Sequence, residues 1–153
     1  MTNLNKMNSL IAKSGSPTRI TKTQLGTVIS VPVSCKSDSF DALISVSEYI
    51  IEAEIQIQSD MVVDPYYCPA VKEVIGQVNL RSPRFKWRLL DTGRFAIEHV
   101  SRADTLEQLA MNIHPKVIKD MAKKMTTFGP WIESVGDGSK SLNEVSVELV
   151  NVR

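Results

Sequence analysis

The sequence has few of the residues and motifs that indicate catalysis or metal binding. It contains two cysteines, Cys35 and Cys68, and two histidines, His99 and His114. Neither cysteine lies in a CxxC pair, and the spacing of these four residues matches no zinc-finger pattern. We therefore expect no metal site and no cofactor, and we interpret both cysteines as free thiols in a reducing compartment.

Motifs of the common enzyme classes are also missing. The chain has no GxGxxG, no GxxxxGK[ST] and no GxSxG. Glu52 and Glu54 form a carboxylate pair, but their spacing places both on the solvent face of a predicted strand. A thiol–imidazole enzyme would pair one of the cysteines with His99 or His114. No glycine-rich segment near either cysteine offers an oxyanion site, and both histidines are more typical of structural roles. We predict no catalytic residues and no enzyme.

Long apolar runs are absent as well. A membrane-spanning helix needs roughly 20 apolar residues, whereas Val28–Val33 is short and Tyr49–Ile57 alternates with polar residues. The segment Met1–Leu10 has no apolar core of the signal-peptide type. We expect synthesis in the cytosol without export.

Acidic residues are missing from the first 37 positions, which carry a net charge of +5, while the rest of the chain carries −4 and the whole chain +1. Residues 1–24 are rich in Ser, Thr, Asn and Lys, and this composition predicts a flexible basic arm before a single globular domain at 25–153. A basic arm on a mildly acidic body suits a lipid surface, nucleic acid or an acidic protein. A solubilising tail is the alternative. The candidate binding residues of the arm are Lys6, Lys13, Arg19 and Lys22.

Hydrophobic periodicity predicts the first elements of the fold. Leu25–Val33 and Tyr49–Gln58 alternate with period two and are predicted strands, with Pro32 confining the first to an edge or bulge. Even-numbered residues from 52 to 58 are expected to face water, and Ser34–Asp41 is expected to be a loop. Ala70–Val78 carries a helical apolar stripe.

The second half of the chain predicts two hairpins around two helices. Phe85–Leu90 and Arg94–Val100 flank Asp91-Thr92-Gly93, which suits a type I turn followed by a left-handed glycine. Two helices follow, one capped by Asp104 and one beginning at Pro115 and ending at Gly129-Pro130. Trp131–Val135 and Leu142–Val150 are then read as a second hairpin. The prediction is an α+β fold, a single domain with a mainly antiparallel sheet packed by two to three helices.

Two further features suggest binding surfaces. Lysines recur on one face of the second predicted helix, and they form either a second basic surface or an ordinary solvated face. These residues are Lys116, Lys119, Lys123 and Lys124. Tyr66 and Tyr67 follow Pro65 in a predicted loop and are candidates for self-association, unless one ring folds back onto the sheet.

Nucleic-acid binding has weaker support from the sequence. Arg84–Arg88 interleaves basic and aromatic residues, a pattern that could favour base stacking. On a strand, however, Phe85 and Trp87 point away from Lys86 and Arg88, so we expect both aromatic rings in the core. A nonspecific electrostatic contact with RNA stays open.

The order of elements resembles the matrix proteins of rhabdoviruses. The resemblance rests on Glu48–Asp60, on Pro83–Gly93, and on a spacing of residues near the end of the long helix. That spacing consists of Asp120, Lys124, Phe128, Gly129 and Glu133. Asp64-Pro65-Tyr66-Tyr67 is not the PPxY budding motif of animal members, and the chain is short for the family. These departures fit a divergent or plant-infecting member and put recruitment of the host budding machinery in doubt.

The resemblance implies a non-enzymatic structural protein of the virion. Such a protein self-associates beneath the envelope and bridges the nucleocapsid to the inner membrane leaflet, with the viral nucleoprotein and glycoprotein as further partners, during assembly and budding. It implies locations in the virion, in the host cytoplasm and on inner membrane surfaces, with passage into the nucleus left open. The alternative is a nucleic-acid-binding or host-interaction accessory module.

Overall fold

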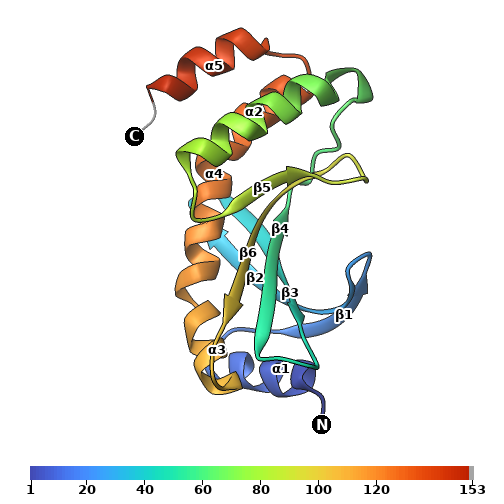
Figure 1. The fold of residues 1–153 in the computed structure, drawn as a ribbon, viewed down its shortest axis with the longest axis vertical. Coiled ribbons are helices and arrows are strands. Elements are labelled where there is room, and N and C mark those ends of the chain that lie inside the picture. The colour runs from blue at the N-terminus through green and yellow to red at the C-terminus, as the bar shows by residue number, and fades with distance from the viewer. Residues whose placement is uncertain (152–153) are drawn as a thin grey trace. The chain divides into compact units, whose positions relative to one another are not determined.

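Helices and strands are mixed along the chain in the computed structural model, which describes residues 1–151 (Figure 1). The α-helices in this range are α1 (Asn3–Lys13), α2 (Cys68–Arg81), α3 (Leu106–Ile113), α4 (Lys116–Gly136) and α5 (Leu142–Val150), with a 3-10 helix η1 (Pro65–Tyr67). The strands are β1 (Arg19–Thr23), β2 (Gly26–Cys35), β3 (Asp38–Val46), β4 (Glu52–Gln58), β5 (Lys86–Leu89) and β6 (Phe95–Arg102).

The strands hydrogen-bond in the order β1-β2-β3-β4-β6-β5, and the pairs β1–β2, β2–β3 and β3–β4 are antiparallel. The α+β class with a mainly antiparallel sheet is therefore confirmed, although the helices outnumber the two or three expected. Contacts divide the chain into two compact units. The first unit comprises Met1–Ile57 and Glu98–Lys123, and the second comprises Gln58–Ile97 and Lys124–Arg153.

The core of the first unit is built on β2, β3 and β4. Ile29, Ile44 and Ile55 are fully buried and lie in register across the three strands. Strand β1 pairs with β2 only from Gly26 to Ser30. The predicted edge strand is therefore corrected, because β2 lies between β1 and β3 in the sheet. Pro32 lies past the end of the β1 pairing and is paired only with Asp41 of β3, so a proline is tolerated in this inner strand.

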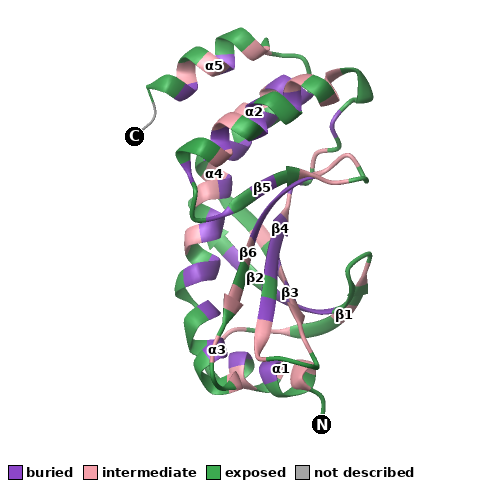
Figure 2. Cartoon of the chain, viewed as in Figure 1, coloured by how far each residue is buried: buried purple, intermediate pink, exposed green. Residues whose placement is uncertain are grey.

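The first unit also corrects two predicted loops. The expected loop at Ser34–Asp41 is instead a tight hairpin, because Cys35 pairs with Asp38 and β3 begins there. Residues 1–24 were expected to form a flexible arm, but they contain α1 and β1. Met7 and Ile11 are one helical turn apart and fully buried, so packing of this stripe stabilises a helix despite its polar composition (Figure 2).

The N-terminus of α1 is capped from two directions. Thr2 accepts a hydrogen bond from Asn5 N–H at 3.2 Å. The carboxylate of Glu48, in the turn between β3 and β4, accepts bonds from Asn3 N–H at 2.7 Å and from Leu4 N–H at 3.0 Å. These acceptors satisfy the first free N–H groups of the helix and place a negative charge at its positive end.

Strand β4 confirms one predicted face and corrects the other. Ala53, Ile55 and Ile57 are buried as expected. Gln56, predicted to face water, is 1% exposed and donates a hydrogen bond from its Nε2 to Glu98 Oε2 at 2.7 Å. The polar face of β4 is covered at Gln56 because β6 places the buried Glu98 beside it. The hydrogen bond between these two side chains gives each buried polar group a partner.

In the second unit, the predicted helix at Ala70–Val78 and the hairpin around Gly93 are confirmed. The buried residues of α2 are the predicted stripe Val71, Val74, Ile75 and Val78. Gly93 has a φ of 87°, and Leu90 N–H donates to Arg94 O at 2.7 Å to close the turn. The side chain of Asn79 on α2 bonds both the N–H and the C=O of Trp87 on β5, at 2.7 and 3.0 Å.

The predicted C-terminal hairpin is wrong. Helix α4 continues through Pro130 to Gly136, and Leu142–Val150 forms α5. The buried residues of this part of α4 are Met125, Phe128, Ile132 and Val135, whose spacing of three and four continues the helical stripe. Their packing outweighs the Gly129-Pro130 stop signal. Helix α5 begins with a capping box between Ser141 and Glu144.

Candidate functional site

The predicted basic residues of the N-terminal segment lie on ordered elements of the first unit. Lys6 and Lys13 are on α1, and Arg19 and Lys22 are on β1, the outer strand of the sheet. All four side chains are exposed. Their backbone positions are held by helix and sheet, so these charges are presented on a surface and not on a mobile tail.

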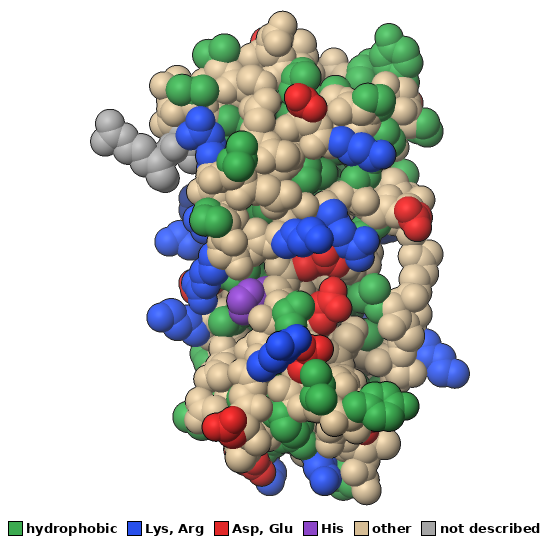
Figure 3. Space-filling model, in the orientation of Figure 1, with side chains coloured by type: hydrophobic (Ala, Val, Ile, Leu, Met, Phe, Trp, Pro, Cys, Tyr) green, Lys and Arg blue, Asp and Glu red, His purple; other side chains and the backbone are tan. Residues whose placement is uncertain are grey.

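Three of the four lysines predicted to form one face of α4 are exposed in the same unit. Lys116, Lys119 and Lys123 are exposed in the first unit, at positions i, i+3 and i+7 of one helix. Figure 3 shows basic side chains along the edge that α4 occupies in Figure 1. Lys124 belongs to the second unit, is half-buried, and has its Nζ 5.7 Å from the centre of the Phe128 ring. Its ammonium group therefore has a cation–π contact.

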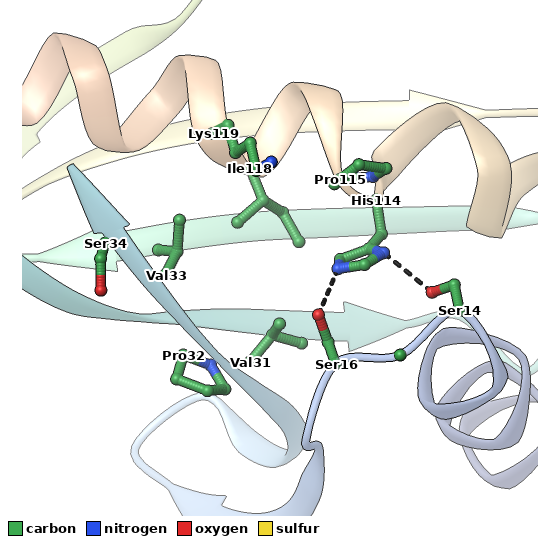
Figure 4. Close-up of a pocket in the computed structure, with 11 residues that line it drawn as sticks. Ser14, Ser16, Val31, Pro32, Val33, Ser34, His114, Pro115, Ile118 and Lys119 are labelled. Atoms are coloured by element: carbon green, nitrogen blue, oxygen red, sulfur yellow. Dashed lines mark hydrogen bonds between the residues drawn. The ribbon is translucent and has the colours of Figure 1, made fainter.

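A hollow of about 470 Å³ lies in the first unit beside the start of α4 (Figure 4). One wall is the connection between α1 and β1, a second is β2, and a third is the junction of α3 with α4. The lining residues are Ser14, Gly15, Ser16, Val31, Pro32, Val33, Ser34, His114, Pro115, Ile118 and Lys119. Segments about 100 residues apart in the sequence thus share one concave surface.

His114 bridges two of these walls with both ring nitrogens. Ser14 Oγ lies 2.9 Å from Nδ1, and Ser16 Oγ lies 2.6 Å from Nε2. Ser14 also donates its hydroxyl hydrogen to Ile11 O at 2.6 Å. Ser14 must then accept from Nδ1–H, and the lone pair of Nε2 must accept from Ser16 O–H. This network assigns neutral His114 the Nδ1–H tautomer.

The surroundings of His114 favour its neutral form. Burial lowers the pKa of His114 below its ordinary value of 6.5, and the nearby ammonium of Lys119 lowers this pKa further. Desolvation penalises the charged imidazolium, and a like charge adds repulsion. Both ring nitrogens of His114 have a hydrogen-bond partner, as the sequence-based interpretation expected.

The contact between Ser16 and His114 has the pairing of a nucleophile with a base, but the third member is a hydroxyl. In hydrolytic triads a carboxylate accepts the Nδ1–H bond and stabilises the imidazolium. Here Ser14 occupies that place, and no lining residue of the hollow carries a carboxylate. The arrangement is better suited to holding the α1–β1 connection against α4 and to presenting hydroxyl, imidazole and ammonium groups to a bound molecule.

The two predicted self-association residues differ in exposure. Tyr66 is 82% exposed, whereas Tyr67 is half-buried. The Tyr67 ring packs against the turn at Gly138, so closely that no side chain would fit there, and it meets the Tyr66 ring edge-on at 5.0 Å between centroids. Tyr67 thus supports the exposed ring of Tyr66.

The structure also exposes an aromatic residue that sequence reasoning placed on a strand. Tyr49 is 97% exposed and Ile50 is 51% exposed, in the turn that Glu48 fixes to α1. The signal in the sequence was Ser47, whose hydroxyl accepts from the N–H groups of Tyr49 and Ile50 at 3.2 and 3.3 Å. Such local side-chain bonds are typical of turns.

The cysteines and histidines are not gathered into a metal site in the described chain. Cys35 and Cys68 are free and half-buried, on β2 and at the start of α2. Within residues 1–151, no group of three or more His, Cys, Asp or Glu side chains is arranged to hold a metal ion. None of the helices in this range combines the length and apolar character needed to cross a bilayer.

Comparison with known proteins gives no match. No family model, no curated protein and no solved structure is significantly similar to the chain.

Proposed function

We propose that the protein is a structural assembly protein of the viral matrix type. It attaches to anionic surfaces through the basic side chains of its first unit, associates with copies of itself, and bridges the nucleocapsid to the inner face of the envelope membrane. This role requires a stable basic surface and a self-contact, and it requires no catalytic centre. The viral nucleoprotein, the viral glycoprotein and the inner membrane leaflet are its expected partners.

One observation carries this proposal. Seven of the eight predicted basic residues are exposed on helices and strands of the first unit. These residues are Lys6, Lys13, Arg19, Lys22, Lys116, Lys119 and Lys123. Each basic side chain near an anionic membrane contributes about 1 kcal/mol. Several charges held by a folded surface support reversible peripheral attachment that weakens as salt increases.

Vesicle co-sedimentation tests the attachment. Replacing Lys6 and Lys13 together by Glu should weaken binding to anionic phosphatidylserine vesicles by at least about thirtyfold, from about 1 kcal/mol per lysine lost. The matched control reverses Lys72 and Lys86, two exposed lysines of the second unit. Binding that survives the first double reversal, or that both doubles weaken equally, would contradict attachment through this surface.

Self-association is tested separately by sedimentation velocity over a range of protein concentrations. Tyr66→Ser removes the exposed ring, and an aromatic anchor at the centre of an interface contributes about 2 kcal/mol or more. We expect the concentration needed for assembly to rise by about thirtyfold. Tyr49→Ser, in the other unit, is the matched loss of an exposed tyrosine. Equal effects of the two variants would remove Tyr66 as the self-contact.

The alternative is a nucleic-acid-binding or host-interaction accessory module. One observation argues against nucleic-acid binding by stacking of bases on aromatic rings. Phe85 and Trp87 are 2% and 1% exposed, so both rings are in the core as expected, and neither is available for base stacking. Any RNA binding would be electrostatic. Salt-dependent RNA binding by a strictly monomeric protein that ignores vesicles would favour this alternative.

A further inference from the structure

The ionisable groups that line the hollow beside His114 are all basic. Its two ionisable lining groups are His114 and the ammonium of Lys119, and none of the eleven lining residues is acidic. The α1–β1 connection and β2 contribute hydroxyls, a proline and aliphatic groups to its other walls. The first turn of α4, which begins beside the hollow, also has no acidic side chain.

The hydroxyl groups of the hollow respond to the protonation of His114. In the neutral ring, Ser16 O–H is used in donating to Nε2. In the imidazolium both nitrogens carry hydrogens, so Nε2–H donates to Ser16 Oγ and the hydroxyl hydrogen of Ser16 is released. Ser14 keeps donating to Ile11 O in both forms. Protonation therefore creates one positive charge and one free hydroxyl donor at the same wall.

We propose that this hollow binds a phosphate-type oxyanion, with Lys119 and protonated His114 supplying charge and the released Ser16 hydroxyl supplying a hydrogen bond. The volume of about 470 Å³ lies within the range of about 300–1,000 Å³ typical of small-ligand sites. Charge-assisted bonds to a tetrahedral oxyanion are shorter and stronger than neutral ones. The phosphate can be free or part of a lipid headgroup, and the lipid source rests on the proposed attachment to membranes.

Binding and protonation are linked in this arrangement. An oxyanion beside His114 offsets the repulsion by Lys119, so it raises the pKa of His114 from its lowered value. By the same linkage, the oxyanion binds more tightly as the pH falls through the pKa of His114. A rise of one pKa unit corresponds to about tenfold tighter binding to the protonated form.

Histidine-ring NMR of the full chain tests this inference directly. Sulfate is the first probe, because it is a tetrahedral oxyanion that does not itself titrate in this range, and inorganic phosphate is the second. Compared with chloride at matched ionic strength, each should raise the pKa of His114 by about one unit. The resonances of His99 are the internal control. An unchanged His114 titration with both probes would overturn the proposal.

Two lysine variants distinguish a specific oxyanion site from a general attraction of anions to basic side chains. Lys119→Gln should abolish the response of His114 to sulfate, whereas Lys116→Gln, one turn earlier and outside the lining, should preserve it. Ser16→Ala should weaken sulfate binding by about tenfold to 150-fold, the equivalent of the roughly 1.5–3 kcal/mol that a hydrogen bond to a charged group contributes. Equal losses in the two lysine variants would mean that no site exists.

Vesicles distinguish the two sources of phosphate. If the ligand is a lipid headgroup, Lys119→Gln should weaken binding to phosphatidic acid vesicles more than Lys116→Gln does. If the ligand is free, phosphate should shift His114 while the two variants bind vesicles equally. Salt-sensitive vesicle binding without any response of His114 to oxyanions would overturn the hollow as a site and leave the proposed function standing.

Discussion

The capping of α1 by Glu48 gives a sharp test of whether the basic N-terminal segment is folded. Glu48→Ala removes both acceptors that Asn3 N–H and Leu4 N–H use, at 2.7 and 3.0 Å. Thr2 still accepts from Asn5 N–H, so the first turn keeps one cap. Loss of an N-terminal cap costs about 0.5–2 kcal/mol, and the charge-assisted bonds place Glu48 in the upper part of that range.

The expected result is a local effect. A loss of about 1–2 kcal/mol raises the population of opened α1 by about five- to thirtyfold. Hydrogen exchange should quicken by that factor at the amides of α1 that surround Met7 and Ile11, the two residues that the helix buries. Exchange in the strands of the first unit should change less, since their ladders do not include Glu48.

Two further variants, one intermediate and one control, are compared with Glu48→Ala. Glu48→Gln keeps a single acceptor oxygen and should lie between wild type and Glu48→Ala. Glu54→Ala removes an exposed carboxylate from β4 of the same unit and serves as the charge-matched control. If wild-type α1 exchanges as fast as an unfolded peptide, or if Glu48→Ala and Glu54→Ala behave alike, the helix and its role in presenting Lys6 and Lys13 are refuted.

Three other predictions concern stability and titration. Asn79→Ala leaves the Trp87 backbone on β5 without its two side-chain bonds, and it should lower the free energy of unfolding by about 1–3 kcal/mol in urea; an unchanged midpoint would contradict this. Lys140→Met removes the main cause of the lowered pKa of Glu148, so carboxyl-carbon NMR should show this pKa rising toward its ordinary value. The stability that the Lys140–Glu148 ion pair adds at pH values above the ordinary pKa of Glu148 should then be lost. Because the pKa of His114 is lowered, stability should fall as the pH decreases through 6.5 and level off below the pKa of the folded protein, and His114→Gln should flatten that part of the curve.

The elements that the sequence predicted well have one unambiguous period. Helix α2 and strand β4 each carry several aliphatic residues in an uninterrupted pattern. The sequence predicts a strand in place of α5 because the spacing of Val145, Val147 and Leu149 suits both the period of two of a strand and the roughly 3.6-residue turn of a helix. Val147 is 66% exposed while the other two are buried, so the helical spacing of four is the one used. The capping box at Ser141 was the signal that could have decided it.

The candidate site was beyond sequence reasoning for a different reason. Ser14 and Ser16 lie about 100 positions from His114, and a serine beside a glycine has no local pattern that indicates a histidine partner. Their meeting depends on α1 packing against α3, which in turn depends on a helix hidden in a polar segment.

The same folding changes how the basic charges can act. On a flexible arm, each lysine would lose side-chain and backbone freedom on binding, at about 1–2 kcal/mol per ordered residue for the backbone alone. That cost equals or exceeds the gain of about 1 kcal/mol per lysine at an anionic surface. With Lys6 and Lys13 on α1 and Lys119 on α4, the backbone is ordered before binding. Attachment by a small number of charges is therefore more favourable for this folded surface than for the tail that its composition predicted.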